Sequence, residues 1–173
     1  MVANPTLHAR GYDGDRLAAS VVRTLAANPL CSMATRSEAG AVHISTAFFS
    51  YSQDLIFSFL SHPDSLHSHN LRSVPQMAVA VFDSRQPWGA PHAGLQLFGA
   101  GALTPDDAVQ AARALYAARF PRYGDLLKRA SAGRQIGPIF GALRFHSFMP
   151  ERVQILDEWE FGDEAFITAT ILR

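Results

Sequence analysis

The sequence has few of the residues that mark many common functions. Its 15 basic and 15 acidic residues give a net charge of zero, and Lys128 is the only lysine. Nucleic acids and anionic membranes select for basic surfaces, so we expect neither as a partner. No apolar run reaches the roughly 18 residues that span a bilayer, and residues 1–15 lack the apolar stretch of a signal peptide. A single cysteine, Cys31, excludes an intrachain disulfide and predicts a cytoplasmic location.

Sequence motifs for self-contained catalysis are also missing. The chain has no G-x-S-x-G elbow, no H-E-x-x-H and no informative Cys–His pairing. His62, Asp64 and His67 do not follow the ligand spacing of zinc sites, so we predict no metal site. These absences leave the catalytic residues unassigned. They fit a protein whose bound cofactor performs the chemistry while the chain binds and orients it.

What is present fits one globular domain. The 173 residues are 48% hydrophobic, enough for a sizeable core. We predict a loose N-terminal tail over residues 1–12 and a single domain over 13–173. No internal repeat or low-complexity tract suggests a further boundary.

Periodicity and breakers predict the following elements. We expect helices over 13–28, 66–73, 104–119 and 123–132, and strands over 30–36, 41–52, 55–61, 77–82, 95–103, 142–149, 152–159 and 166–172. Thr104 is the expected N-cap of the third helix, and Gly99 inside a strand predicts a bulge or a close backbone approach. Consecutive strands joined by short turns favour antiparallel pairing. The fold class is therefore mainly β with helices (α+β), a six- to seven-stranded antiparallel split or closed β-barrel.

The segment from Ser61 to Asp83, SHPDSLHSHNLRSVPQMAVAVFD, carries most of the functional information. A polar turn leads into a short helix that ends before Pro75, and an apolar strand follows directly. Two strands, AVHISTAFFSYS and DLIFSFLS, precede it. This order of hairpin, short polar helix and strand is typical of small β-barrels that hold an anionic cofactor at the rim.

Several motifs, taken in order, resemble the pyridoxamine 5′-phosphate oxidase-like, FMN-binding split-barrel superfamily. They are LCSMATRSEAGAVHISTAFF, DLIFSFLSHPDSLHSHNL, VPQMAVAVFD, LQLFGAGALTPDDA, ALYAARFP and ALRFHSFMPERVQILDE. The resemblance covers residues 30–159. The GLQLFG and RFP features are most similar to a poorly characterised branch of the superfamily, not to the vitamin B6 oxidases proper.

The resemblance implies a homodimer with FMN in a cleft between two barrels, and a small-molecule substrate that enters this cleft. It implies a flavin-dependent reductase or oxidase reaction of unnamed substrate. The implied cofactor-binding positions are His43, Ile44, Ser45, Thr46, Ala47 and Phe48 on the flavin strand, Ser58 and Phe59 on the next strand, Ser61, Ser65, Leu66, His67 and Asn70 around the phosphate, and Gln96 near the flavin ring.

The chain departs from the family pattern at three cationic positions. The phosphate-binding lysine of the family falls on His67, a neighbouring arginine falls on Leu66, and an arginine of the flavin strand falls on His43. Histidine supplies positive charge only when it is protonated, whereas lysine and arginine supply it permanently. We therefore expect weaker and more pH-dependent FMN binding than in typical relatives.

Other functions remain open at this point. The barrel is alternatively a non-catalytic module for haem or flavin, and His43, His67 or His146 would then be the candidate axial ligand of haem. A deazaflavin-dependent reductase and a dimeric scaffold without cofactor are further alternatives. Each candidate residue also has a structural explanation: His67 on a solvated helix face, His43 as a cross-strand surface residue, and Gln96 facing water.

Overall fold

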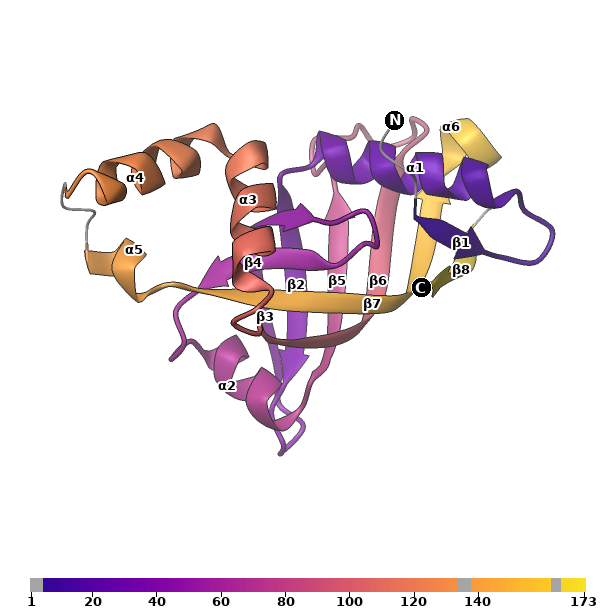
Figure 1. The fold of residues 1–173 in the computed structure, drawn as a ribbon. Helices are drawn as coiled ribbons and strands as arrows, with labels where there is room; N and C mark the ends of the chain where they lie inside the picture. Colours follow the sequence, from indigo (N-terminus) through magenta and orange to yellow (C-terminus); the bar gives the residue numbers. More distant parts are fainter. Residues whose placement is uncertain (1–4, 134–137, 163–165) are drawn as a thin grey trace.

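A computed structural model of the protein describes residues 5–133, 138–162 and 166–173, and its centre is a closed barrel (Figure 1). Six antiparallel strands close in the order β2-β3-β4-β7-β6-β5, because β5 pairs back onto β2. The strands are β1 (Thr6–His8), β2 (Leu30–Arg36), β3 (Val42–Tyr51), β4 (Phe57–Ser61), β5 (Gln76–Phe82), β6 (Ala93–Leu103), β7 (Arg144–Asp157) and β8 (Phe166–Leu172). The expected α+β split barrel is confirmed.

The long strand β7 differs from the sequence-based expectation. The sequence predicts two strands, 142–149 and 152–159, separated at Pro150-Glu151. The structure has one continuous strand, because a bulge accommodates the proline: Phe98 pairs with Arg152 and Gly99 with Pro150, so Glu151 has no partner in β6. A bulge tolerates the missing proline N–H without ending the strand.

Gly99 is required at this bulge, as the sequence indicates. A Cβ atom on Gly99 would lie 2.1 Å from the carbonyl oxygen of Met149 and 2.6 Å from Cα of Pro150. Both neighbours are backbone atoms of the facing strand, and these cannot rotate away. The absence of a side chain at Gly99 therefore lets β6 and β7 approach closely enough to close the barrel.

The N-terminal segment is more ordered than predicted. The sequence predicts a loose tail over residues 1–12, but Thr6–His8 form β1 and pair antiparallel with Thr170–Leu172 of β8. β8 in turn pairs with β7. Because the partner of β1 lies more than 160 residues further along the chain, local sequence gives no sign of this pairing. Residues 1–4 lie outside the described part of the chain.

The described helices are α1 (Gly14–Ala27), α2 (Leu66–Ser73), α3 (Val109–Arg119), α4 (Pro121–Ser131), α5 (Pro138–Ala142) and α6 (Glu158–Phe161). In Figure 1, α1 and α2 lie at opposite ends of the barrel. The third helix begins five residues later than expected. Thr104 does not cap it, because its hydroxyl lies 2.7 Å from Ser147 Oγ of β7 and holds the preceding loop on the barrel instead.

The core fills the barrel and continues under α1. Fully buried aromatic rings of Phe49, Phe57 and Phe148 come from three adjacent strands, β3, β4 and β7. The buried stripe of α1 includes Leu17 and Val21, and it closes one end of the barrel. Burial of this apolar surface is the main source of stability for such a domain.

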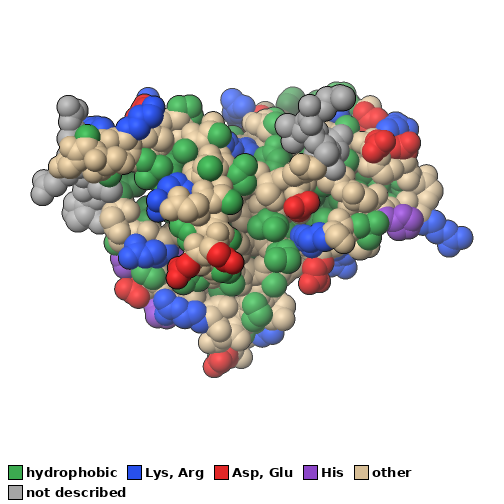
Figure 2. All heavy atoms as spheres, in the orientation of Figure 1, with side chains coloured by type: hydrophobic (Ala, Val, Ile, Leu, Met, Phe, Trp, Pro, Cys, Tyr) green, Lys and Arg blue, Asp and Glu red, His purple; other side chains and the backbone are tan. Residues whose placement is uncertain are grey.

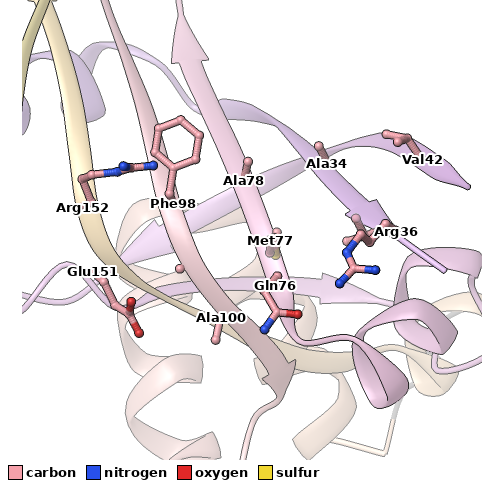
Figure 3. Close-up of a pocket in the computed structure, with 12 residues that line it drawn as sticks. Ala34, Arg36, Val42, Gln76, Met77, Ala78, Phe98, Ala100, Glu151 and Arg152 are labelled. Atoms are coloured by element: carbon pink, nitrogen blue, oxygen red, sulfur yellow. The ribbon is translucent and has the colours of Figure 1, made fainter. Parts of the chain in front are cut away.

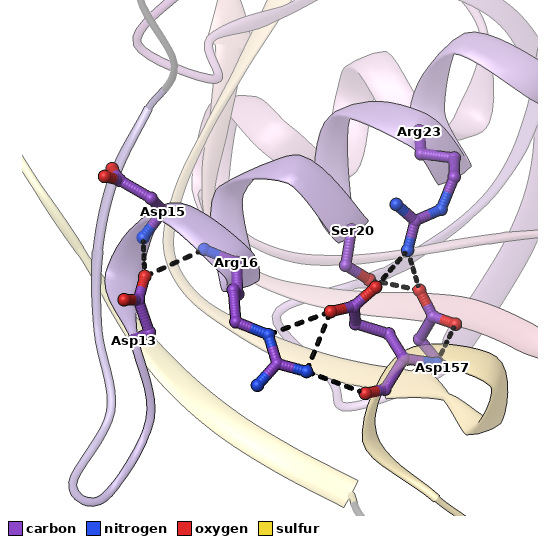
Figure 4. Close-up of polar contacts among 7 residues, drawn as sticks. Asp13, Asp15, Arg16, Ser20, Arg23 and Asp157 are labelled. Carbon is purple, nitrogen blue, oxygen red and sulfur yellow. Dashed lines mark hydrogen bonds and ion pairs between the residues drawn. The ribbon is translucent and has the colours of Figure 1, made fainter.

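A buried carboxylate fastens α1 to the end of β7 (Figure 4). The side chain of Asp157 is 2% exposed, and its Oδ2 accepts hydrogen bonds from Ser20 Oγ and Arg23 Nη2, both at 2.6 Å. Its Oδ1 accepts the backbone N–H of Glu160 at 3.2 Å. Arg16 Nε donates to the Glu160 carboxylate at 2.9 Å on the exposed side of the same network. Both Asp157 oxygens are thus satisfied, which a buried charge requires.

Within the described ranges, no helix combines the length and apolar character needed to cross a membrane.

The bulge generates a stability prediction. We expect Gly99→Ala to destabilise the protein by about 2–4 kcal/mol, because its Cβ would displace backbone of β7. Gly101→Ala in the same strand is the matched control, since its Cβ would meet the flexible side chains of Met77 and Leu71 instead. Urea unfolding followed by circular dichroism measures both variants. Equal losses in the two variants would contradict the role given to the Gly99 contact.

Candidate functional site

Polar side chains meet at the barrel end that α2 covers. Ser65 is the N-cap of α2, and Pro63 and Asp64 lie in the turn that precedes this helix. Ser61 Oγ at the end of β4 lies 2.6 Å from His67 Nε2, Ser65 Oγ lies 3.1 Å from the same nitrogen, and the two hydroxyls are 3.1 Å apart. Three polar atoms therefore form a triangle at the N-terminus of α2. We call Ser61, Ser65, His67, Ser68 and His146 the Ser/His cluster.

The Ser/His cluster extends into the barrel through Ser68. Ser68 Oγ lies 2.7 Å from Ser65 Oγ and 3.0 Å from His146 Nε2, and His146 Nδ1 lies 3.3 Å from the carbonyl oxygen of Arg144. His146 is 2% exposed and its ring stacks on Phe59 at 5.5 Å. A continuous hydrogen-bonded chain thus connects the half-buried turn with a buried histidine on β7.

Three imidazole rings surround this region. The ring of His43 on β3 lies parallel to that of His67, with centroids 6.2 Å apart and an interplanar angle of 12°. The rings of His67 and His146 have centroids 6.3 Å apart. Among the described residues, no group of three or more His, Cys, Asp or Glu side chains could hold a metal ion.

The two inner histidines are poorly disposed to carry charge. Burial lowers the pKa of His67, and His146 and His43 lower it further. Burial also lowers the pKa of His146, although the bond to the Arg144 carbonyl opposes this shift. Ser68 Oγ donates its one proton to the carbonyl oxygen of His62 at 3.0 Å, so it is an acceptor toward Ser65 Oγ and His146 Nε2. Ser61 Oγ can donate to His67 Nε2 when that ring is neutral.

No permanent cation takes part in the Ser/His cluster. In the part of the chain that the structure describes, no arginine or lysine side chain hydrogen-bonds to its members. The nearby Arg72 of α2 donates instead to the carbonyl oxygen of Pro63 at 2.7 Å, and its Nη1 lies 3.3 Å from His69 Nδ1. Leu66, where the family pattern has an arginine, is 56% exposed. Any anion here would depend on hydroxyl groups, helix N–H groups and protonated histidine.

The remaining predicted site residues divide between the two faces of the sheet. The register places Ile44 opposite Ala34, Ala34 opposite Ala78, and Ala78 opposite Phe98. This row lies on the outer face of β3, β2, β5 and β6, beside a hollow of about 640 Å³ whose lining includes Ala34, Ala78 and Phe98 (Figure 3). Thr46, Phe48 and Gln96 lie on the same outer face. Gln96 is three strand spacings from Thr46, about 14 Å.

The other predicted positions lie inside the barrel or against α3. Ser45 Oγ is buried without a hydrogen-bond partner among the described residues. Ala47 is partly buried against the core, while Asn70 Nδ2 donates to Thr35 Oγ1 at 3.1 Å and so ties α2 to β2. Ser58 is buried on the outer side of β4, the side on which α3 packs. The structure thus brings His43, Ser61, Ser65 and His67 together and leaves Ser58 and Gln96 apart from them.

Two members of the Ser/His cluster escape the residue-by-residue carry-over from the family. Ser68 is absent from the predicted set, and His146 enters the sequence analysis only as a candidate haem ligand. The register of β7 brings His146 opposite Phe59, 87 residues earlier in the chain. The one sequence signal for His146 is its place in the motif RFHSF. Side chains alternate along a strand, so His146 shares a face with the apolar Phe148, while Phe145 and Ser147 point to the other face.

Cys31 is not part of this site. It is 4% exposed, and burial raises the pKa of its thiol to about 12. A neutral buried thiol is inert as a nucleophile.

Comparison with known families identifies the class of protein. The family model described as pyridoxamine 5′-phosphate oxidase matches residues 17–157. This match spans most of the chain and includes the barrel, α2 and the Ser/His cluster. The chain therefore belongs to the pyridoxamine 5′-phosphate oxidase family. A search of curated proteins gave no match.

Solved structures with the same fold differ in what their names describe. The haem storage protein HutZ from Vibrio cholerae matches with a TM-score of 0.65 and 16% identity over 86% of this chain and 99% of that chain. A haem-binding protein from Mycobacterium smegmatis matches with a TM-score of 0.63 and 18% identity over 88% of this chain, which spans 57% of that protein. General Stress Protein 26 from Bacillus anthracis matches with a TM-score of 0.58 and 11% identity, covering 82% and 94% of the two chains. At these identities the similarity establishes the fold.

The lowered pKa values predict an acid-sensitive fold. A histidine whose pKa is lower in the folded than in the unfolded state binds protons preferentially after unfolding. Its stabilising contribution is complete above pH 6.5 and is lost as the pH falls toward the folded-state pKa. We expect the free energy of unfolding, from urea titrations, to fall between pH 7.5 and pH 5, with at most about 1.4 kcal/mol per pH unit from His146. His146→Gln should flatten this slope.

His69→Gln is the matched control for this prediction, because His69 is exposed on the same helix α2. The free energy of unfolding of His69→Gln should change with pH as it does in the unaltered protein. A His146→Gln variant whose slope matched that of the control would show that His146 does not titrate in this range.

Proposed function

We propose that the protein is a homodimeric FMN-binding flavoprotein that catalyses a reductase or oxidase reaction on a small molecule. The observation that carries the proposal is the convergence of Ser61 Oγ, Ser65 Oγ and His67 Nε2, each within 3.1 Å of the other two. Three potential donors at a helix N-terminus suit the terminal phosphate of a nucleotide. Family membership supports the same assignment.

The cluster fits a phosphate when it takes up protons. A protonated His67 donates from Nε2 directly to a phosphate oxygen. A protonated His146 donates from Nε2 to Ser68 Oγ, whose own proton stays on the carbonyl oxygen of His62. The Ser65 hydroxyl turns its proton from Ser68 toward the phosphate. The negative charge of a phosphate favours both protonations, because it raises the pKa of each imidazole.

The proposed place of the flavin ring is along β3, where the family pattern puts it. FMN supplies hydride transfer when it is bound, and the chain supplies position and electrostatics. The unpartnered hydroxyl of Ser45 and the half-buried ring of His43 are the polar groups that β3 offers on its inner side. Ile44, Thr46 and Phe48 are the side chains on the outer side of β3.

The outer sheet face supports the proposed homodimer. Val42 and Ile44 of β3 are 75% and 69% exposed, and Phe48 of β3, Leu30 of β2 and Phe82 of β5 are also exposed on this face. Exposed apolar side chains gathered on one sheet face are typical of an interface. Arg36 and Arg152 border it, and Arg152 lies over the Phe98 ring at 4.5 Å (Figure 3). A second copy would cover the apolar strip and enclose a cleft.

FMN titration tests the phosphate site. We expect the dissociation constant to rise between pH 6 and pH 8.5, by about tenfold per pH unit for each proton taken up. His67→Lys should tighten FMN binding at pH 8 at least tenfold and weaken the pH dependence, because lysine keeps its charge. His67→Ala should weaken binding. His69→Lys adds the same charge on the exposed side of α2 and is the matched control.

The outcomes of the FMN titration separate the proposal from its competitors. A dissociation constant that is constant from pH 6 to pH 8.5, or one that His67→Lys and His69→Lys change equally, would remove the cluster from the phosphate site. Protein that rejects FMN and elutes as a monomer would overturn the whole proposal.

Haem is the second candidate ligand. The structural neighbours HutZ and the Mycobacterium smegmatis protein are haem proteins by name. The absence of fixed cations from the Ser/His cluster is the observation in this chain that favours haem over FMN. An absorption band near 400 nm after addition of haem, lost in His43→Ala or His67→Ala, would support this candidate, whereas bound flavin absorbs near 450 nm.

A further inference from the structure

Two adjoining hollows lie between the helices α4 and α5 on one side and the barrel wall on the other. Their volumes are about 810 and 550 Å³, within the range of small-molecule pockets, and both are lined by Leu60, Tyr123, Leu126, Phe140 and Leu143. Figure 1 shows α4 and α5 standing off the barrel beside α3, and Figure 2 shows hydrophobic side chains gathered on this side. We call the two together the arch hollow.

The walls of the arch hollow are apolar and incompletely covered. α4 has no buried residue, although an amphipathic helix normally buries its apolar stripe. Leu126 and Leu127 of α4 are only partly buried, and Phe140 of α5 is 46% exposed. Across the hollow, the rings of Tyr116 of α3 and of Phe120, the residue that caps the end of α3, pack with their centroids 4.7 Å apart. The hollow thus offers apolar surface on both sides that no part of the described chain fills.

The charged side chains that line the arch hollow are mostly positive. They are Arg113, Arg119, Arg122 and Arg144, against the single carboxylate of Asp106. None of the four arginines forms an ion pair with another described residue. Arg119 is engaged elsewhere, because it donates to the carbonyl oxygens of Leu25 and Asn28 and stacks on Phe49. Arg113 and Arg122 keep their charge available.

Arg113 is the best-placed anchor for an anion. Its Nε is buried without a hydrogen-bond partner among the described residues. It also faces Tyr123: burial raises the pKa of that phenol, and the Arg113 guanidinium opposes the rise. A guanidinium next to a phenol O–H in an apolar surrounding is a strong site for a carboxylate, because both groups donate and little water competes.

We propose that the arch hollow binds an apolar small-molecule carboxylate, with its hydrocarbon portion between α4 and the barrel and its carboxylate at Arg113 and Tyr123. Charge complementarity selects the acid over a neutral or cationic molecule of the same shape. Thr46, Ala47 and Phe48 of β3 form part of the wall, so the acid would lie beside the strand proposed to carry the flavin. The binding itself does not depend on a flavin.

Isothermal titration of the full chain with dodecanoate, below its micellar concentration, tests the proposal. We expect saturable binding of dodecanoate, and at least tenfold weaker binding of dodecyltrimethylammonium, which has the same chain and the opposite charge. Acetate, which has the carboxylate without the chain, should not bind detectably. The dissociation constant of dodecanoate should be the same with and without FMN, so this result does not depend on the flavin proposal.

Variants locate the bound acid. Arg113→Gln should weaken dodecanoate binding about tenfold or more, as expected for loss of a charge-assisted hydrogen bond, and Arg113→Lys should restore part of it. Leu126→Asn should weaken binding through the apolar wall. Arg129→Gln, at an exposed position of α4, is the matched control and should change the dissociation constant of dodecanoate less than twofold.

Three results would overturn the proposal. One is the absence of saturable dodecanoate binding by folded protein, including the case in which a second copy fills the hollow and the chain elutes as a dimer. Another is equal affinity for dodecyltrimethylammonium. The last is unchanged affinity in both Arg113→Gln and Leu126→Asn, which would place the acid elsewhere on the molecule.

Discussion

The structure depends on the closure of the barrel by β7. This strand pairs with β6 along one edge, and with β4 and then β8 along the other. Both ends of the molecule depend on it, because it carries His146 to the Ser/His cluster and Asp157 to the clamp on α1. The pairing with β6 requires the bulge at Gly99, where any side chain would meet backbone. The close approach of β6 and β7 at Gly99 therefore fixes the proposed cofactor end under α2, the opposite end under α1 and the distance between them.

The chemical character of the Ser/His cluster follows from what surrounds it. Hydroxyl groups and neutral imidazoles satisfy one another, so the cluster is stable without a ligand. Charging it costs free energy, because His67 and His146 lie in a poorly solvated region and repel one another when protonated. An anion reverses this balance. A site built with lysine and arginine would instead hold an anion with little dependence on pH. In the proposed function the histidines would link anion binding to proton uptake, which differs from the pattern of the family.

The alternation of side chains along β3 illustrates the reach and the limit of sequence reasoning. The sequence separates His43 and Ser45 from Ile44 and Thr46 correctly, because successive residues of a strand face opposite sides. It does not say which side faces the interior, since both sides carry apolar residues. The structure decides this through the neighbours: His43 faces His67 of α2, whereas Ile44 faces solvent beside Ala34. Similarly, Pro150 suggests the end of a strand, but the bulge keeps β7 continuous.

The amino-acid sequence by itself determined most of the barrel strands, the short helix α2, the close approach at Gly99 and the family, because these depend on periodicity, breakers and motifs within a few residues. Tertiary structure decided the rest: the pairing of β1 with β8, the place of His146 beside Ser68, the separation of Gln96 from the cluster, and the arch hollow under α4. Each of these joins residues that lie far apart in the chain or leaves a surface uncovered. Only the closed barrel, in which every strand finds both neighbours, brings such residues within hydrogen-bond or van der Waals distance.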